Sequence, residues 1–277
     1  MHITITGNLG SGKSTICKIL QGQYGFEIYS TGIVQREIAR EMNITTLEMN
    51  QLMCSDHKYD TMIDDATARL SRENRDKNII FDSRLAWHFV EQSFKVFLSV
   101  SLDVAAERVM KDNRGKEETY SSIEEAKELL AARAQTEDKR YKDIYNLEYF
   151  NFCNYNLVID STCSTPEMIA EIIMSEAKKY ELAMNKKHVY EQGNQGINRV
   201  LISPTRLYLD KISKEDALRL TSLVNQIKEQ KDYIQKEIII EKNGEEHTIR
   251  KGKDDVFAAL LAEVPFVSIH LMTNKIK

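Results

Sequence analysis

The chain has 277 residues, of which 42% are hydrophobic and 29% are charged. These proportions are ordinary for a soluble globular protein, and they supply enough apolar material for a buried core. The formal net charge of −4 excludes a global basic field that would attract nucleic acid.

The sequence shows no targeting segment and no membrane-spanning segment. Residues 1–6 lack the basic start and the long apolar run of a signal peptide, and no stretch reaches the ~18 apolar residues of a membrane span. The cysteines form no CxxC pair and lie far apart, at Cys17, Cys54, Cys153 and Cys163. Such spacing disfavours metal knuckles and disulfide frameworks. We therefore expect a cytoplasmic enzyme with reduced thiols.

Short apolar segments alternate with helical patterns over the first two thirds of the chain. Strands are expected at 2–6, 26–29, 78–82, 95–99 and 156–160. Helices are expected at 13–23, 34–42, 56–73, 102–112, 121–143 and 165–182. This alternation predicts an α/β fold in three layers, with helices on both faces of a five-stranded parallel sheet. The expected domain covers residues 1–183.

The pattern changes at residues 184–198, a polar stretch with two glycines that we interpret as a linker. After it, residues 199–277 form a small α+β accessory domain. Its expected elements are strand 199–203, helix 213–229, strand 235–241, strand 246–250, helix 254–262 and strand 266–271.

The strongest signal in the sequence lies between the first expected strand and the first expected helix. Residues 7–15 fit the phosphate-loop pattern GxxxxGK[ST] in the strand–loop–helix context that it requires. Glycines let backbone N–H groups turn inward around the β-phosphate. Lys13 is expected to reach the β- and γ-phosphates, and the Ser14 hydroxyl to reach Mg²⁺. The expected ATP-binding residues are Gly7, Asn8, Leu9, Gly10, Ser11, Gly12, Lys13, Ser14 and Thr15.

A phosphate loop does not fix the reaction, because GTPases, motor ATPases and small-molecule kinases all have one. The absence of an NKxD-type guanine motif disfavours a GTPase. A small kinase also needs arginines that hold the acceptor phosphate and neutralise the transferred phosphoryl group. Candidate arginines lie in three segments, at 28–40, 82–87 and 133–141.

Together with the phosphate loop, these segments resemble the cytidylate kinase family, particularly its compact second type from archaea and some bacteria. Residues 30–39 fit STGxxxRxxA, residues 82–86 are similar to xGRLA, and residues 133–141 are similar to RxxSExxRY. Asp56 to Asp64 also resembles the DxxxDxxID segment of that family. The resemblance covers about residues 1–180. It implies the P-loop NTPase fold, ATP as donor, Mg²⁺ as cofactor and CMP as acceptor, with dCMP a second acceptor.

The resemblance also implies roles for single residues. Arg133 and Arg140 would lie on a lid helix and fold over the γ-phosphoryl group, and Glu137 between them would hold them in place. Arg108 would pack beside the ATP base. Acceptor contacts would come from Thr31, Gly32, Arg36 and Arg84. Arginine suits these positions because its planar fork binds two phosphate oxygens at once.

Some positions depart from the family pattern, and some have a plainer interpretation. Asp82-Ser83 stands where the family has Glu-Gly, Ile33 where it often has Asp, and Thr136 where it has Ser. The plainer interpretation of Arg133 with Glu137 is an ordinary surface ion pair of little energetic value. Trp87, His88 and the many tyrosines are interpreted as packing residues.

The acceptor base leaves an open question. Cytosine presents an N4 amino donor, for which a carboxylate is the natural acceptor. Asp60 and Asp64 are the candidates by position, and either could equally be a surface acid on its helix. A kinase for AMP, UMP or a metabolite such as shikimate, and a P-loop regulatory protein that senses nucleotide, are the alternative functions.

Residues 199–271 are similar to the ParB N-terminal and sulfiredoxin-like fold, through their element order and phrases such as residues 201–207. Functional members carry an arginine in the loop before the second helix, whereas this loop reads Lys251-Gly252-Lys253-Asp254-Asp255. Its acids would repel phosphates. We expect a degenerate module for regulation, dimerisation or partner binding, and we expect neither nucleic acid nor membrane as a partner.

Overall fold

The first strand, β1 (His2–Gly7), is buried at all six positions, so both faces of its sheet are covered. The computed structural model describes residues 1–44, 48–49, 52–53, 58–111, 120–186, 197–207, 212–228, 234–243 and 246–272. Their contacts divide the chain into two units, Met1–Tyr155 and Asn156–Lys277.

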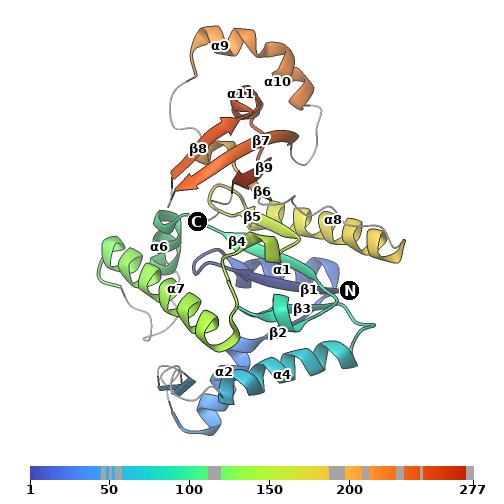
Figure 1. Ribbon diagram of the computed structural model, residues 1–277, viewed down its shortest axis with the longest axis vertical. Helices are drawn as coiled ribbons and strands as arrows, with labels where there is room; N and C mark the ends of the chain where they lie inside the picture. Colours follow the sequence, from blue (N-terminus) through green and yellow to red (C-terminus); the bar gives the residue numbers. More distant parts are fainter. Residues whose placement is uncertain are drawn as a thin grey trace. The chain divides into compact units, whose positions relative to one another are not determined.

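Four parallel strands form the sheet of the first unit. Its order is β2 (Glu27–Ser30), β3 (Ile79–Asp82), β1 and β4 (Phe94–Ser99), and Figure 1 shows these strands side by side. Ile5 of β1 is in register with Asp82 of β3, so the two strands end at the same edge of the sheet. In open α/β sheets, ligands bind at the carboxyl ends of the strands. This edge is therefore where the site is expected.

The helices of the first unit begin and end where local chemistry dictates. The longest one, α7 (Ile123–Tyr145), starts at Ser122, whose hydroxyl accepts a hydrogen bond from the Glu125 backbone N–H at 3.1 Å. It ends at Asn146, which has a left-handed backbone with φ 54°. The other helices are α1 (Lys13–Tyr24), α2 (Thr31–Glu41), α4 (Lys58–Glu73), α5 (Ala86–Phe89), α6 (Leu102–Lys111) and the short 3₁₀ helix η1 (Phe152–Asn154).

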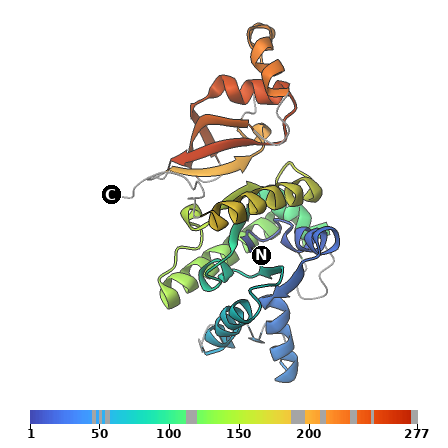
Figure 2. The same cartoon turned by 90° about the vertical axis from the view of Figure 1, so that its right-hand side faces the viewer.

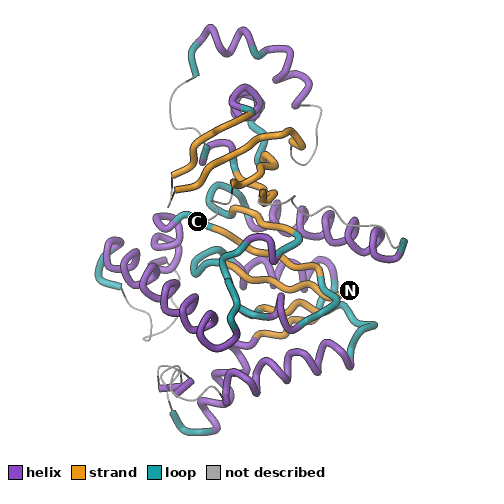
Figure 3. The backbone as a smooth tube through the Cα atoms, in the orientation of Figure 1, coloured by secondary structure: helices purple, strands orange, loops and turns teal. Residues whose placement is uncertain are grey.

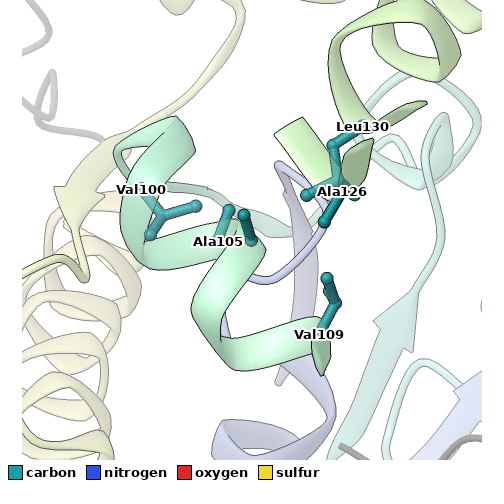
Figure 4. Packing of buried hydrophobic residues seen from close by; sticks show 6 residues of the cluster. Val100, Ala105, Val109, Ala126 and Leu130 are labelled. Atoms are coloured by element: carbon teal, nitrogen blue, oxygen red, sulfur yellow. The ribbon is translucent and has the colours of Figure 1, made fainter. Parts of the chain in front are cut away.

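Helices α6 and α7 pack against each other through small and branched side chains. Figure 4 shows this cluster, in which Ala105 and Val109 of α6 face Ala126 and Leu130 of α7. Leu9 of the phosphate loop packs against the same cluster. The α6–α7 pair therefore has a fixed apolar contact with the loop.

The second unit begins with β5 (Leu157–Asp160) and α8 (Pro166–Asn185). Its sheet has the order β5-β6-β9-β7-β8, with β6 (Ile197–Ile202), β7 (Ile234–Asn243), β8 (Glu246–Lys251) and β9 (Val267–Met272). The remaining helices are η2 (Pro204–Arg206), α9 (Lys214–Arg219), α10 (Thr221–Lys228) and α11 (Lys253–Leu261). Helix α10 packs on α11, and α11 packs on β7 (Figure 2).

The element order confirms the α/β fold with a mostly parallel sheet, followed by a smaller α+β part. One prediction is wrong, because the helix expected at 213–229 is two helices, separated by the loop visible in Figure 3. The Thr221 hydroxyl donates to the carbonyls of Ala217 and Leu218, at 3.3 and 2.9 Å, and such local bonds compete with helix continuation. The short α5 was not expected. No helix in the described part of the chain combines the length and apolarity of a membrane span.

The expected linker falls mostly outside the described residues, as does Cys54, while Cys17, Cys153 and Cys163 are free thiols. Strand β5, expected to close the first domain, pairs in parallel with β6, with Ile159 opposite Leu201. Across the same pair, Arg206 Nη1 donates to Asp160 Oδ2 at 2.9 Å and to Thr162 Oγ1 at 2.8 Å. The domain boundary near residue 183 stays a prediction.

The Arg206–Asp160 ion pair leads to a prediction about stability. Both side chains are buried, at 12% and 6% exposure. Arg206→Leu removes a cation from beside a buried carboxylate and should cost about 3 kcal/mol of unfolding free energy. Arg250→Leu is the matched control, because Arg250 is 55% exposed and pairs with Glu241 at the surface. Urea unfolding followed by circular dichroism measures both. Equal midpoints for the two variants would contradict the prediction.

Candidate active site

The phosphate loop between β1 and α1 has the backbone that its glycines permit. Gly10 and Gly12 have φ values of 75° and 85°, in the left-handed region that favours glycine. A Cβ on Gly10 would lie 2.8 Å from the Ala105 Cα on α6, so the loop also needs the missing side chain for its close approach. Gly12 directly precedes α1, whose N-terminus therefore faces the loop.

Side chains from three segments of the chain donate hydrogen bonds to the Gly7 carbonyl oxygen at the end of β1. Among the described residues, three side chains donate to it: Lys13 Nζ at 3.2 Å, Arg84 Nη1 at 2.9 Å and Tyr149 OH at 3.0 Å. Lys13 Nζ also donates to the Asn8 carbonyl at 3.3 Å. The two cations that were predicted to bind different phosphates thus lie side by side on the loop.

Arg84 reaches the loop because it directly follows β3. The Thr6 hydroxyl of β1 donates to the carbonyls of Ser83 and Arg84, at 2.6 and 3.1 Å, and fixes the direction in which the chain leaves the strand. The Arg84 guanidinium then lies beside α7, the helix expected to form the lid, where Nε donates to Glu137 Oε2 at 2.9 Å.

Glu137 holds two arginines with its two carboxylate oxygens. Oε2 accepts from Arg84, and Oε1 accepts from Arg133 Nε at 3.1 Å. The Glu137 side chain is 17% exposed, so this is no simple solvated surface pair. Burial alone would raise the pKa of Glu137, but Arg84 and then Arg133 outweigh it, and the pKa is lowered. The carboxylate is therefore charged at neutral pH and links the lid helix to the phosphate loop.

Farther along the lid helix, two contacts join α7 to α4. Arg140 Nη2 lies 3.5 Å from Asp60 Oδ1, and the Tyr145 hydroxyl donates to Asp64 Oδ2 at 2.5 Å. Burial raises the pKa of Asp64 to about 6, with the nearby Asp60 adding to the rise and the Tyr145 hydrogen bond opposing it. Neither aspartate is a solvated surface acid, because both are buried.

The other predicted residues lie in two places. Arg108 Nη1 on α6 donates to the Gly10 carbonyl at 3.2 Å, on the opposite side of the loop motif from Gly7. Thr31 and Gly32 begin α2 and are half-buried. Arg36 belongs to α2 as well, but its side chain lies outside the described part of the structure.

Residues 2–163 of the chain, which include every site residue described above, match the model of the cytidylate kinase-like family. The chain belongs to this family. A cytidylate kinase of Methanobrevibacter smithii is 32% identical over 64% of this chain and 99% of its own length. A cytidylate kinase of Methanothrix thermoacetophila is 35% identical over 58% of this chain and 88% of its own length.

Two further likenesses are more limited. An S-adenosylmethionine-dependent nucleotide dehydratase of Lacinutrix mariniflava is 33% identical over 64% of this chain, but over only 36% of its own length. A solved shikimate kinase of Aquifex aeolicus covers 66% of this chain and 99% of its own, at 16% identity and a TM-score of 0.40. The family relationship makes this chain an ATP-dependent nucleoside monophosphate kinase.

For this cytidylate kinase-like chain, the structure adds three residues for which the sequence predicted no role in the site. Tyr145 and Tyr149 were interpreted as packing residues, yet both use their hydroxyls in the site. Tyr141, Tyr145 and Tyr149 recur at intervals of four, a regularity that could have drawn attention to them. Asp82 ends β3 close enough to Lys13 to raise its pKa electrostatically, and its position before Arg84 was the available signal.

A magnesium ion fits the residues present. Ser14, in the first turn of α1, has an exposed hydroxyl next to Lys13. In P-loop enzymes, Mg²⁺ is held by the hydroxyl after the loop lysine together with a carboxylate, nucleotide phosphates and water, and Ser14 fits the first of these ligands.

Lys13 leads to a prediction about pH. Burial lowers its pKa to about 7, and the adjacent Arg84 adds to the effect, whereas Asp82 and Glu137 oppose it. As pH rises from about 7 to 9, the free enzyme loses this charge, so kcat/KM for ATP should fall by up to about tenfold per pH unit. The value of kcat should change less, because bound phosphates stabilise the ammonium form.

Steady-state kinetics across this pH range measure the effect. Lys13→Arg is the matched variant, because an arginine keeps its charge throughout. It should have lower activity and a flat profile. A flat profile in the wild type, or the same decline in Lys13→Arg, would contradict the pKa of about 7 as its cause.

Proposed function

We propose that this kinase transfers the γ-phosphoryl group of ATP to CMP, with dCMP as a second acceptor and Mg²⁺ as cofactor. The observation that carries the proposal is a linked set of charges at the phosphate loop: Lys13 and Arg84 donate to the Gly7 carbonyl, and Glu137 joins Arg84 to Arg133. The relatives of this chain include two cytidylate kinases aligned over most of their length. The dehydratase relative aligns over only 36% of its length, so the activity in its name need not reside in the shared segment.

In the proposed reaction, an acceptor phosphate oxygen attacks the γ-phosphorus in line with the departing ADP oxygen. These oxygens are anionic at neutral pH, so no general base is required, and the protein supplies position and positive charge. Lys13, Arg133 and Arg140 would neutralise the phosphoryl oxygens. Arg36 and Arg84 would orient the acceptor phosphate. Mg²⁺, held by Ser14 and the ATP phosphates, would neutralise further charge.

Asp60 and Asp64 remain the proposed acceptors for the cytosine N4 amino group. The structure supports them to different degrees. Tyr145 holds Asp64 in one orientation, which suits a residue that must meet a base edge. Asp60 pairs with Arg140 and would therefore also hold a lid arginine in place.

The second part of the chain is proposed to regulate, dimerise or bind a partner, because every residue named in the reaction lies in Met1–Tyr155. The Asp254 carboxylate in the first turn of α11 is already paired, since Arg219 of α9 donates to both of its oxygens, at 2.6 and 2.8 Å. This internal pairing supports a degenerate module without catalytic role.

The choice of acceptor is tested with a panel of nucleoside monophosphates. With ATP and Mg²⁺, we expect CMP and dCMP to be phosphorylated well ahead of AMP and GMP, because their base offers the N4 amino donor to a carboxylate. An assay coupled to ADP release measures turnover for each acceptor. Equal or faster turnover of AMP, or of a non-nucleotide such as shikimate, would contradict the cytidylate assignment and leave the kinase fold untouched.

The two arginine roles are separated by kinetics. Arg84→Ala should mainly raise the KM for the acceptor, whereas Arg140→Ala should mainly lower kcat, because the first removes a ground-state contact and the second a transition-state contact. Each effect should be about tenfold or more. Arg69→Ala, an exposed arginine on α4, is the control and should change neither constant. The same kinetic defect in both variants would remove the distinction.

A further inference from the structure

Tyr149 lies in the loop that follows the lid helix, and it is 1% exposed. Its ring packs between elements far apart in the sequence: Phe97 of β4 at 5.9 Å between ring centroids, and Tyr141 of α7 at 5.8 Å. Its own carbonyl accepts a hydrogen bond from the Tyr155 hydroxyl at 2.8 Å. These contacts fix the ring, and the ring aims the hydroxyl at the Gly7 carbonyl, 3.0 Å away.

The three donors to the Gly7 carbonyl differ in what the reaction demands of them. Lys13 and Arg84 are cations that the proposed function sends to phosphate groups, one on ATP and one on the acceptor. Each cation has several N–H groups, but bound phosphate oxygens attract the same ammonium and guanidinium groups and therefore compete with the Gly7 carbonyl for them. Tyr149 is neutral and has no such second task. Among the described side chains at this carbonyl, it is the donor that can stay.

A buried carbonyl that loses its donors is costly, and this carbonyl begins the phosphate loop. Gly7 has a φ of 151°, and the N–H of the next residue, Asn8, donates to the Leu98 carbonyl at 3.0 Å. A rotation of the Gly7–Asn8 peptide would break that hydrogen bond and redirect the N–H groups that follow it. A hydrogen bond to the Gly7 carbonyl therefore helps to hold this peptide, and the loop that follows it, in one orientation.

We propose that Tyr149 is a positioning residue of the phosphate loop, whose hydroxyl keeps the Gly7 carbonyl hydrogen-bonded while Lys13 and Arg84 bind phosphate. This inference rests on the proposed function, which supplies the phosphates. The hydroxyl is a donor over the whole useful pH range, because burial raises the pKa of Tyr149 to about 12. Its link to Tyr141 also connects the loop to the lid helix.

Tyr149→Phe in the full chain tests the proposal, because it removes one oxygen and keeps the ring. Without ATP, Lys13 and Arg84 still donate to Gly7, so the melting temperature should stay close to that of the wild type. With ATP, Lys13 turns toward the phosphates and Arg84 would be the one donor left at Gly7 among the described side chains, so the Kd for ATP should rise about tenfold. The KM for ATP should rise with it, and the KM for CMP should rise as well, because acceptor binding then draws Arg84 away from the same carbonyl.

Tyr155→Phe is the matched control, because Tyr155 is also a buried tyrosine whose hydroxyl donates to a backbone carbonyl. It should lower the melting temperature without ATP and raise the Kd for ATP less than Tyr149→Phe does, because it removes one contact of Tyr149 but keeps the Tyr149 hydroxyl. Calorimetric titration with ATP and thermal unfolding of both variants measure the contrast.

Two results would overturn the inference: a Tyr149→Phe variant that binds ATP as the wild type does, or one that unfolds without ATP more readily than Tyr155→Phe. Both leave the proposed function in place, because the wild type would still phosphorylate CMP. A wild-type chain that neither binds ATP nor phosphorylates any acceptor would instead remove the proposed function, and this inference with it.

Discussion

The concentration of positive charge around the end of β1 is the constraint on which the site depends. Lys13 and Arg84 donate to the same carbonyl oxygen, and the carboxylate of Glu137 joins Arg84 to Arg133. Like charges at such distances repel strongly where water is excluded. Glu137 offsets this repulsion by binding two of the arginines. Burial is the main cause of the lowered pKa of Lys13, and the repulsion from Arg84 adds to it. The phosphate loop is thus surrounded by cations, two of which are held together by the carboxylate of Glu137.

The fold makes this concentration possible by ending two strands at one edge. Gly7 and Asp82 end neighbouring parallel strands, so the segments that follow them begin at the same edge of the sheet. The lid helix then brings Glu137 and Arg133 from more than fifty residues away. This helix packs against α6 through small and branched side chains, and Leu9 of the phosphate loop packs against the same cluster. The positions of the charged residues thus depend on an apolar contact between the two helices.

Much of this arrangement could be predicted from the sequence, because its elements carry local signals. The phosphate loop has a fixed spacing, the strands are short apolar runs, and the arginine segments resemble a family pattern in order and spacing. The pairing of Glu137 with Arg133 follows from their four-residue separation on a helix. Contacts between distant segments could not be predicted in the same way. That Glu137 also binds Arg84, that Arg140 meets Asp60, and that Tyr149 reaches Gly7 depend on tertiary packing alone. The break between α9 and α10, beside which the Thr221 hydroxyl donates to the Leu218 carbonyl, is likewise not indicated by helical periodicity.

The pairing of β5 with β6 has a consequence for the chain in a crowded cell. Strand β5 lies inside the segment that matches the cytidylate kinase-like family, and β6 lies beyond it. An unpaired strand edge is a template for another copy of the same strand, and proteins that leave one open are prone to aggregate. By pairing with β5, β6 occupies backbone groups that would otherwise be open to another chain. That edge of β5 is therefore not available as a template for a second copy of the same strand.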